Sequence, residues 1–325
     1  MTTAGRHPLR LMETWRSIFY TPIYVSVAGG FLEREGLDVE FSTCPPQFSH
    51  PLSALHHGAA DIVQSGIMRS IIASDWGAET VPLHFAKINS RDGFFILGRG
   101  PHPDPLPPDP LPEGEGSSHF DWESLRGARV IPVGFSPMPW ASFQYALRRH
   151  GLEPSDLDLR TGLSLNDAVA AFRDGQAEYV HVAEPVVQQL IADGAGHLLT
   201  ALGPENGHLA YSSFAATHRF LAEREDTAAR FTIGFARALH WLSSAEPGEA
   251  AEAVSDFFPE ASQEVLAASI ARYQEQEQWP VSPVLGQPEY HNLHDILLAA
   301  GMCRERQPYA KVVRTDIAEA AIAAL

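Results

Sequence analysis

Cysteine is scarce in this sequence, because its 325 residues contain only Cys44 and Cys303. Neither lies in a C-x-x-C pair or in any other metal-ligand spacing, which argues against a structural zinc site and against a redox motif. The two could form one disulfide, but we expect two buried free thiols.

Long apolar runs are also missing. No stretch approaches the ~18 consecutive apolar residues that a transmembrane helix needs. Residues 1–10 contain neither an apolar segment nor a small-residue cleavage site. No secretory signal is therefore predicted, and the chain as it stands is expected in the cytoplasm.

Basic residues are in the minority, with 23 Lys and Arg against 40 Asp and Glu and a formal net charge of −17. A surface with this many acidic residues repels phosphate backbones and anionic lipid headgroups. We therefore predict no nucleic-acid partner and no membrane insertion. The net charge does not exclude an anionic small ligand, because a few local cations decide whether such a ligand binds.

Signatures of several enzyme classes are absent as well, namely G-x-S-x-G, the Walker A loop, G-x-G-x-x-G and H-E-x-x-H. Among the fifteen histidines, His50, His56 and His57 lie close in sequence. Adjacent helical residues diverge by about 100°, and positions i and i+6 do not share a face. We therefore predict neither a metal site nor a cofactor.

What the sequence does contain is an alternation of strand-like and helix-like segments over the first ~90 residues and again from Arg129 to Ala216. Mainly helical, alanine-rich segments follow from Thr227. This pattern predicts an α/β protein with two lobes, joined by two strand-like crossovers and followed by C-terminal helices. Lobe I is expected to comprise 9–93 and 216–325, and lobe II 94–215.

One segment within the second lobe, 101–116, consists largely of proline, aspartate, glutamate and glycine. Proline has no amide proton, and this stretch offers almost nothing apolar to bury. We therefore predict an exposed, polyproline-like or disordered insertion without a role in function.

Several short motifs resemble a known family. They run in order from Tyr24 through the Gly36-Leu37-Asp38-Val39 turn, the Asp61-Ile62 pair and Leu125–Val130 to Glu184-Pro185. Together they are similar to the solute-binding proteins of ABC transporters for nitrate, sulfonates and taurine, a family that also contains the thiamine-pyrimidine precursor synthases. The resemblance spans 9–325 apart from the proline-rich insertion. It implies the two-lobed type-2 periplasmic-binding-protein fold, with two crossover strands and a ligand between the lobes, and a permease as partner.

Ligands of open α/β sheets lie beyond the carboxyl ends of the strands, near helix N-termini. This rule selects loops in both lobes, and Glu184 before Pro185 is added as a further candidate. The predicted ligand-binding residues are Arg16, Phe19, Tyr20, Thr21, Gln64, Ser65, Gly66, Arg69, Lys87, Asn89, Ser136, Trp140 and Glu184.

Each candidate also has a structural alternative. Arg16 could form a salt bridge that closes the lobes, and Arg69 could be a solvated surface arginine. Ser65-Gly66 could cap a helix, and Lys87 could be an ordinary residue at a strand end. The aromatic side chains could belong to the core, and Glu184 could cap a helix.

The enzymes on this scaffold give a second interpretation, a cytoplasmic decarboxylase-like or desulfinase-like lyase or a hydrolase. The resemblance places Ser65 and Arg69 where the thiamine-pyrimidine synthases carry a Lys and a His, and 208–215 lack their cysteine cluster. Aryl-sulfinate desulfinases use a Cys near position 16, where this chain has no thiol. A decarboxylase using His50 or His181 as the acid stays open. We favour non-covalent binding of a small polar or anionic ligand such as a sulfonate, carboxylate or pyrimidine.

Overall fold

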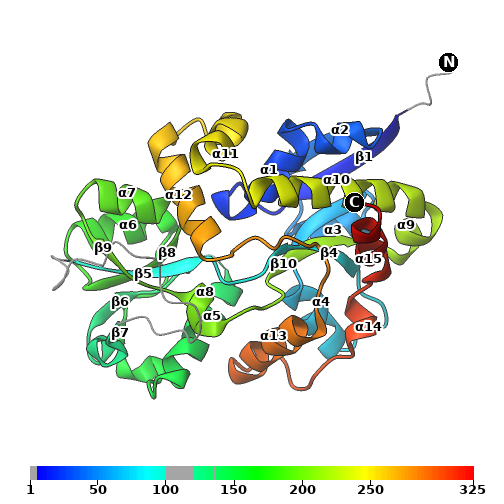
Figure 1. Ribbon diagram of the computed structural model, residues 1–325. Coiled ribbons are helices and arrows are strands. Elements are labelled where there is room, and N and C mark those ends of the chain that lie inside the picture. The colour runs from blue at the N-terminus through cyan, green and yellow to red at the C-terminus, as the bar shows by residue number, and fades with distance from the viewer. Residues whose placement is uncertain (1–5, 100–119, 135) are drawn as a thin grey trace. The chain divides into compact units, whose positions relative to one another are not determined.

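The computed structural model describes residues 6–99, 120–134 and 136–325. The proline-rich segment 101–116 and Phe135 lie outside the described residues. The chain divides into two compact units: unit 1 comprises 1–90, 209–270 and 279–325, and unit 2 comprises 91–208 and 271–278. Each unit has its own sheet (Figure 1).

The sheet of unit 1 has the strand order β2-β1-β3-β10-β4. Its strands are β1 (His7–Glu13), β2 (Leu37–Thr43), β3 (Ile62–Gly66), β4 (Leu83–Asn89) and β10 (Ser212–Ala216). β1 runs parallel to β2 and β3, with Leu11 opposite Ile62, whereas β10 is antiparallel to β3 and β4. The carboxyl ends of β1, β3 and β4 therefore share one edge with the beginning of β10.

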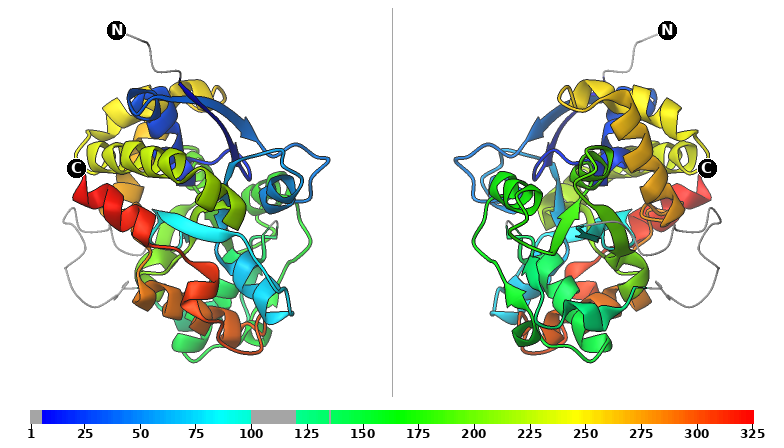
Figure 2. Two further views of the ribbon diagram at one scale, coloured as in Figure 1. Left: turned by 90° about the vertical axis from the view of Figure 1, so that its right-hand side faces the viewer. Right: turned by 90° about the vertical axis from the view of Figure 1, so that its left-hand side faces the viewer.

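Helices cover this sheet: α1 (Thr21–Ala28), α2 (Phe31–Arg34), α3 (Pro51–His56), α4 (Met68–Asp75), α9 (His218–Glu223), α10 (Glu225–Leu242), α11 (Pro247–Val254), α13 (Gln287–Ala299), α14 (Tyr309–Val312) and α15 (Asp316–Ala323). Short 3₁₀ turns are η1 (Ile18–Tyr20) and η4 (Ser255–Phe257). The longest helix, α10, packs against α1, α2 and α15 (Figure 2). It brings Phe231 and Phe235 edge-on to Phe214 of β10, with ring centroids 4.7 and 4.8 Å apart.

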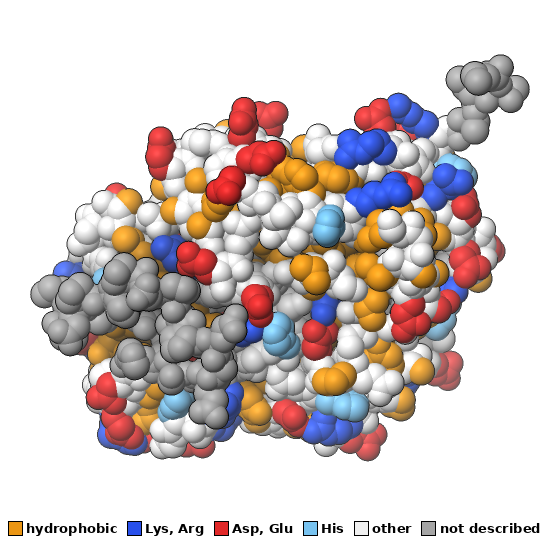
Figure 3. Space-filling model, viewed as in Figure 1, with side chains coloured by type: hydrophobic (Ala, Val, Ile, Leu, Met, Phe, Trp, Pro, Cys, Tyr) orange, Lys and Arg blue, Asp and Glu red, His pale blue; other side chains and the backbone are white. Residues whose placement is uncertain are grey.

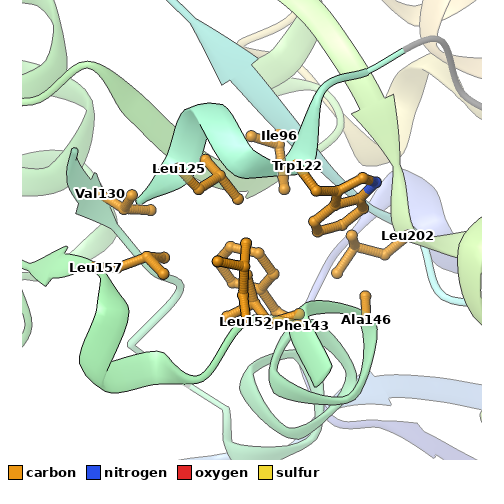
Figure 4. Packing of buried hydrophobic residues seen from close by; sticks show 10 residues of the cluster. Ile96, Trp122, Leu125, Val130, Phe143, Ala146, Leu152, Leu157 and Leu202 are labelled. Atoms are coloured by element: carbon orange, nitrogen blue, oxygen red, sulfur yellow. The ribbon is translucent and has the colours of Figure 1, made fainter. Parts of the chain in front are cut away.

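The sheet of unit 2 has the order β7-β6-β8-β5-β9. Its elements are β5 (Phe94–Gly98), η2 (Trp122–Leu125), β6 (Arg129–Ile131), α5 (Pro137–Arg149), η3 (Pro154–Asp156), β7 (Asp158–Leu159), α6 (Leu165–Arg173), β8 (Tyr179–Ala183), α7 (Val186–Ala192), β9 (His197–Ala201) and α8 (Leu202–Asn206). β5 is antiparallel to both of its neighbours, β8 and β9. Trp122, Phe143, Leu147 and Leu202 belong to a buried apolar cluster against this sheet (Figure 4).

Helix α12 (Gln263–Glu275) belongs to both units, since the division falls after Ile270. The chain passes between the units at 90/91, 208/209, 270/271 and 278/279. Within the described residues, none of the helices is long and apolar enough to cross a membrane.

Both cysteines are free thiols, as predicted, and Cys303 is buried whereas Cys44 is only half-buried.

Candidate functional site

The candidate site in unit 1 lies at the carboxyl edge of its sheet. Ser212, the first residue of β10, pairs with Gly66 at the end of β3 and with Asn89 at the end of β4. At the end of β1, the amide of Thr14 donates to Oε1 of Gln64 (2.9 Å). The predicted residues of unit 1 that follow strands are therefore brought to one edge.

The loop after β1 is held in a fixed shape by backbone hydrogen bonds. The Ser17 amide donates to the Tyr24 hydroxyl (3.0 Å), and the Tyr20 amide donates to the Ser17 carbonyl (2.9 Å). The Phe19 carbonyl accepts from Asn89 Nδ2 (2.7 Å) and from Trp279 Nε1 (2.9 Å). Two segments distant in sequence, at Asn89 and Trp279, thus help to fix the loop that carries Tyr20.

Arg16 lies in this loop but is occupied by a buried partner. Its Nε donates to Oε1 of Glu13 (2.7 Å), a carboxylate without solvent exposure, and Tyr24 donates to Oε2 (2.6 Å). The guanidinium also lies over the Phe257 ring, 4.9 Å from its centroid. The charge is compensated by a salt bridge within unit 1, and not by the expected bridge that closes the lobes, so Arg16 is a poor anion site.

Tyr20 and Gln64 form a buried polar pair at the same edge. The Tyr20 phenol is hydrogen-bonded to the Gln64 side chain, and burial raises the pKa of Tyr20 above its ordinary value. The phenol therefore stays protonated and can donate or accept a hydrogen bond at neutral pH. Phe19 and Thr21 beside it serve the scaffold: the Phe19 ring packs on Tyr211 (5.3 Å), and the Thr21 hydroxyl donates to the Ile18 carbonyl (2.7 Å).

Arg69 differs from the other cations at this edge. It is the second residue of α4, its side chain is exposed, and it has neither a hydrogen-bond nor an ion-pair partner among the residues that the structure describes. Tyr20 and His50 both interact electrostatically with Arg69. Desolvation lowers the pKa of Arg69, and the interaction with Tyr20 acts in the opposite direction. Burial, with the Arg69 charge as a second cause, lowers the pKa of His50 to about 3. Neither group carries a negative charge at neutral pH that would compensate the guanidinium.

The remaining candidates of unit 1 are bound to protein groups. Lys87 Nζ donates to Glu289 Oε1 (2.6 Å), and Asn89 accepts from the Ser212 hydroxyl. The Ser65 hydroxyl donates to the Gly66 carbonyl (3.2 Å). The N-cap of α4 is Ile67, which makes no side-chain cap, so the interpretation of Ser65-Gly66 as the cap is wrong.

In unit 2, the three candidates follow two different strands. Ser136 is the N-cap of α5 without a side-chain cap bond, and Trp140 packs edge-on to Phe143 (5.7 Å) in the first turns of that helix. Glu184 is buried at the end of β8, where its carboxylate accepts from Arg272 of α12 and from the Gln188 amide (3.0 Å). The ion pair favours a structural role for Glu184.

The model of the NMT1-like family matches residues 15–256, about three quarters of the chain. The chain belongs to the NMT1-like family. A relative of this NMT1-like protein from Bacillus subtilis (strain 168), described as "Putative binding protein YtlA", is 30% identical over 312 residues and covers 96% of this chain and 89% of its own length.

Solved structures show that this NMT1-like chain has the fold of periplasmic binding proteins. The alkanesulfonate-binding protein SsuA from Xanthomonas axonopodis pv. citri, bound to MOPS, matches with a TM-score of 0.67 and 17% identity over 96% of this chain and all of its own. The periplasmic nitrate-binding protein NrtA from Synechocystis PCC 6803 matches with a TM-score of 0.68 and 16% identity over 98% of this chain and 89% of its own.

Some residues at the carboxyl edge of unit 1 were not predicted, chiefly Ser212, Tyr211 and Trp279. Tyr211 and Ser212 arrive because β10 is inserted antiparallel, so that its beginning meets the ends of its neighbours. An antiparallel strand shows the same alternation of apolar and polar residues as a parallel one, so its direction cannot be read from the sequence. The rule that ligands lie at the carboxyl ends of strands therefore does not select residues at the beginning of β10. Trp279 reaches Phe19 across 260 residues, and no local pattern marks such a contact.

Histidine, cysteine and carboxylate side chains are the usual protein ligands of a metal ion. Among the described residues, no group of three or more of them is placed to hold a metal ion.

Proposed function

We propose that this NMT1-like protein binds a small anionic or polar organic compound without covalent chemistry, and that its two units close around the ligand. Arg69 would bind the anionic group, and Tyr20 and the amides of the first turn of α4 would complete the hydrogen bonds. Ser136 and Trp140 would contribute from unit 2. The relatives are described as binding an alkanesulfonate or nitrate, which are both anions.

The observation that carries the proposal is the uncompensated guanidinium of Arg69. Arg16, Lys87 and Arg272 each contact a carboxylate, whereas Arg69 has a neutral phenol and a neutral imidazole as neighbours. An exposed guanidinium without a counter-charge is accessible to an anion, which it can bind through charge-assisted, bidentate hydrogen bonds.

The first experiment is a thermal-shift screen with sulfonates, aliphatic and aromatic carboxylates, pyrimidines and nitrate. A ligand at a hundred times its Kd stabilises the protein by about 2.7 kcal/mol. For units of this size, that corresponds to a rise in Tm of roughly 5–10 °C. Mass spectrometry of each hit then separates a binder, which returns the compound intact, from an enzyme, which converts it.

The prediction for Arg69 is specific. Arg69→Ala should weaken binding of the identified anion by more than tenfold in isothermal titration, while Tm changes by no more than about 2 °C, because Arg69 has no hydrogen bond or ion pair to lose among the described residues. Arg69→Lys should be intermediate, since it keeps the charge and loses the planar fork. Arg219→Ala, which removes an exposed arginine of α9, is the matched control and should bind like the wild type. Unchanged affinity in Arg69→Ala would show that the anion binds elsewhere.

The partner and the compartment depend on this outcome. A transport component must meet an ABC permease outside the cytoplasmic membrane, whereas an enzyme on this scaffold would work in the cytoplasm. We propose the permease as the partner, and cell fractionation with an antibody against the chain tests where the protein resides.

The enzymatic alternative is less well supported by the chemistry of its candidate groups. Burial lowers the pKa values of His50 and His181 to about 3, so neither imidazole is a proton donor at neutral pH. Burial raises the pKa of the Cys44 thiol, which makes it a weaker nucleophile.

A further inference from the structure

His50, at the end of the loop between β2 and α3, has one ring nitrogen bound and the other unoccupied. The residue is only 9% exposed. Its Nδ1 accepts from the Leu52 amide (3.2 Å) and thereby caps α3. A ring nitrogen that accepts a hydrogen bond carries no proton, so the neutral imidazole has its proton on Nε2. Among the residues that the structure describes, this Nε2–H has no hydrogen-bond partner.

Two side chains interact electrostatically with His50, and neither offers an acceptor for its Nε2–H. One is Arg69, whose charge adds to burial in lowering the pKa of His50, and a guanidinium has no acceptor. The other is His84 of β4, whose pKa is lowered by burial and then by His50. The Nδ1 of His84 is hydrogen-bonded to the Ser213 hydroxyl (2.6 Å) and its Nε2 to the Ser70 hydroxyl (2.9 Å). Because Ser70 follows Arg69 in α4, both interactions place His50 near the first turn of that helix.

The direction of the Tyr20 hydrogen bond is also set from a backbone amide. The Thr14 amide donates to Gln64 Oε1 (2.9 Å), which leaves the Gln64 Nε2 group to donate to the Tyr20 oxygen. Burial raises the pKa of Tyr20, and the bond with Gln64 acts in the opposite direction, as a donor to the phenol oxygen does. With its oxygen accepting from Gln64, the phenol has its own O–H to donate.

Arg69, His50 and Tyr20 therefore each offer a donor near the first turn of α4. From this arrangement we infer that His50 is a further ligand-binding residue, whose Nε2–H donates to an oxygen of the anion that Arg69 binds. The inference rests on the proposed function, because it concerns the same ligand. It also narrows the ligand class to compounds whose head group is an unprotonated oxyanion. An ammonium group at this place would set donors against donors and a positive charge against Arg69.

Two substitutions separate the ligand contact of His50 from its cap on α3. Asparagine and aspartate are both good N-caps, so an Oδ1 can accept from the Leu52 amide as Nδ1 does. His50→Asn has too short a side chain to place a donor where Nε2 lies. His50→Asp additionally brings a carboxylate close to Arg69. His56→Asn, which replaces an exposed histidine of the same helix, is the matched control.

The probe is methanesulfonate, an anionic head group that carries only a methyl group. Its Kd is measured by NMR titration of the isotope-labelled full chain, and the same titrations are repeated with any larger anion that the screen identifies. We expect Kd to rise about tenfold or more in His50→Asn, which loses one hydrogen bond to an anion. The rise should be larger in His50→Asp, whose carboxylate compensates Arg69. Both variants should keep Tm within about 2 °C of the wild type, and His56→Asn should bind like the wild type.

The imidazole signals of His50 give a second readout that does not depend on the variants. In the ligand-free protein the ring proton should reside on Nε2, and methanesulfonate should shift the Nε2–H resonances while Nδ1 stays unprotonated. A proton on Nδ1, or a Kd in His50→Asn equal to that of His56→Asn, would overturn the inference. Weaker binding in Arg69→Ala would then still support the proposed function. If the wild type binds neither methanesulfonate nor any anion of the screen, the proposed function is wrong and the inference with it. Should His50→Asn fail to fold, the ring signals of the wild type decide.

Discussion

At the scale of single residues, Asp92 combines burial with an ionisable group. Its carboxyl has no solvent exposure, and it accepts from the Phe94 amide (2.7 Å). This hydrogen bond and the one from the Ser142 side chain lower the pKa of Asp92, but burial raises it by more. The resulting pKa of Asp92 is about 7. The protein therefore holds a proton on Asp92 that the unfolded chain gives up in weak acid.

Replacing Asp92 tests this assignment. Between pH 4 and 7 the unfolded chain has lost the proton that the folded protein keeps, so the free energy of unfolding should fall as the pH rises, by at most about 4 kcal/mol. Asp92→Asn removes this effect. Urea denaturation at each pH gives the free energy of unfolding of both proteins. From pH 4 to 7 the value for Asp92→Asn should rise relative to that of the wild type, and above pH 8 the difference between the two values should be constant. A difference that does not depend on pH would contradict the raised pKa.

The positions of the predicted site residues could be selected from the sequence, but their ion-pair partners could not. Arg69 could be chosen because it follows a strand and begins a helix. Lys87 pairs with Glu289, and Glu184 pairs with Arg272, so both ion pairs join residues far apart in sequence. The buried carboxylate of Glu13, which binds Arg16, also accepts a hydrogen bond from Thr43 of β2. No spacing rule reveals such partners, so paired and uncompensated cations look the same in the sequence.

At the scale of elements, the glycines of two helices offer a matched comparison. A Cβ on Gly234 of α10 would lie 2.8 Å from the Phe31 carbonyl oxygen of α2, whereas a Cβ on Gly248 of α11 would meet nothing within 4 Å. Gly234→Ala should therefore destabilise the protein by about 1–3 kcal/mol, because backbone must move. Gly248→Ala should be neutral or stabilise it by up to about 1 kcal/mol. Equal effects in chemical denaturation would show that α10 and α2 are not in such close contact.

Most elements were predictable because their periodicity is local. The alternation at 37–41 marks β2, and the proline at the second helical position marks the beginning of α1. The apolar spacing from Thr21-Pro22 to Gly36 predicts a single helix, but the structure has two, α1 and α2, because Gly30 adopts φ = +68°. The order of the strands was not readable, since β10 lies between β3 and β4 only through long-range pairing.

At the scale of the whole molecule, the net charge of −17 acts on any anionic ligand before it reaches Arg69. Acidic and basic side chains are interspersed over the face shown in Figure 3, with no broad basic field. We expect the association rate constant of an anionic ligand, measured by stopped flow, to rise as salt is increased from about 0.01 to 0.15 M, because screening weakens the repulsion. A rate constant that falls with salt would mean that the local field of Arg69 dominates the approach.

The division of unit 1 into three chain segments has a consequence for synthesis on the ribosome. All five strands of the unit 2 sheet lie within 91–208, so that sheet can assemble once this segment has emerged. Among the described strands of the unit 1 sheet, β10 is the single neighbour of β4, and β4 has no strand to pair with until residues 212–216 have been translated. Helix α15, which packs on α10 and β4, is translated last. The nascent chain is therefore expected to complete the sheet of its second unit before that of its first, although translation begins with the latter.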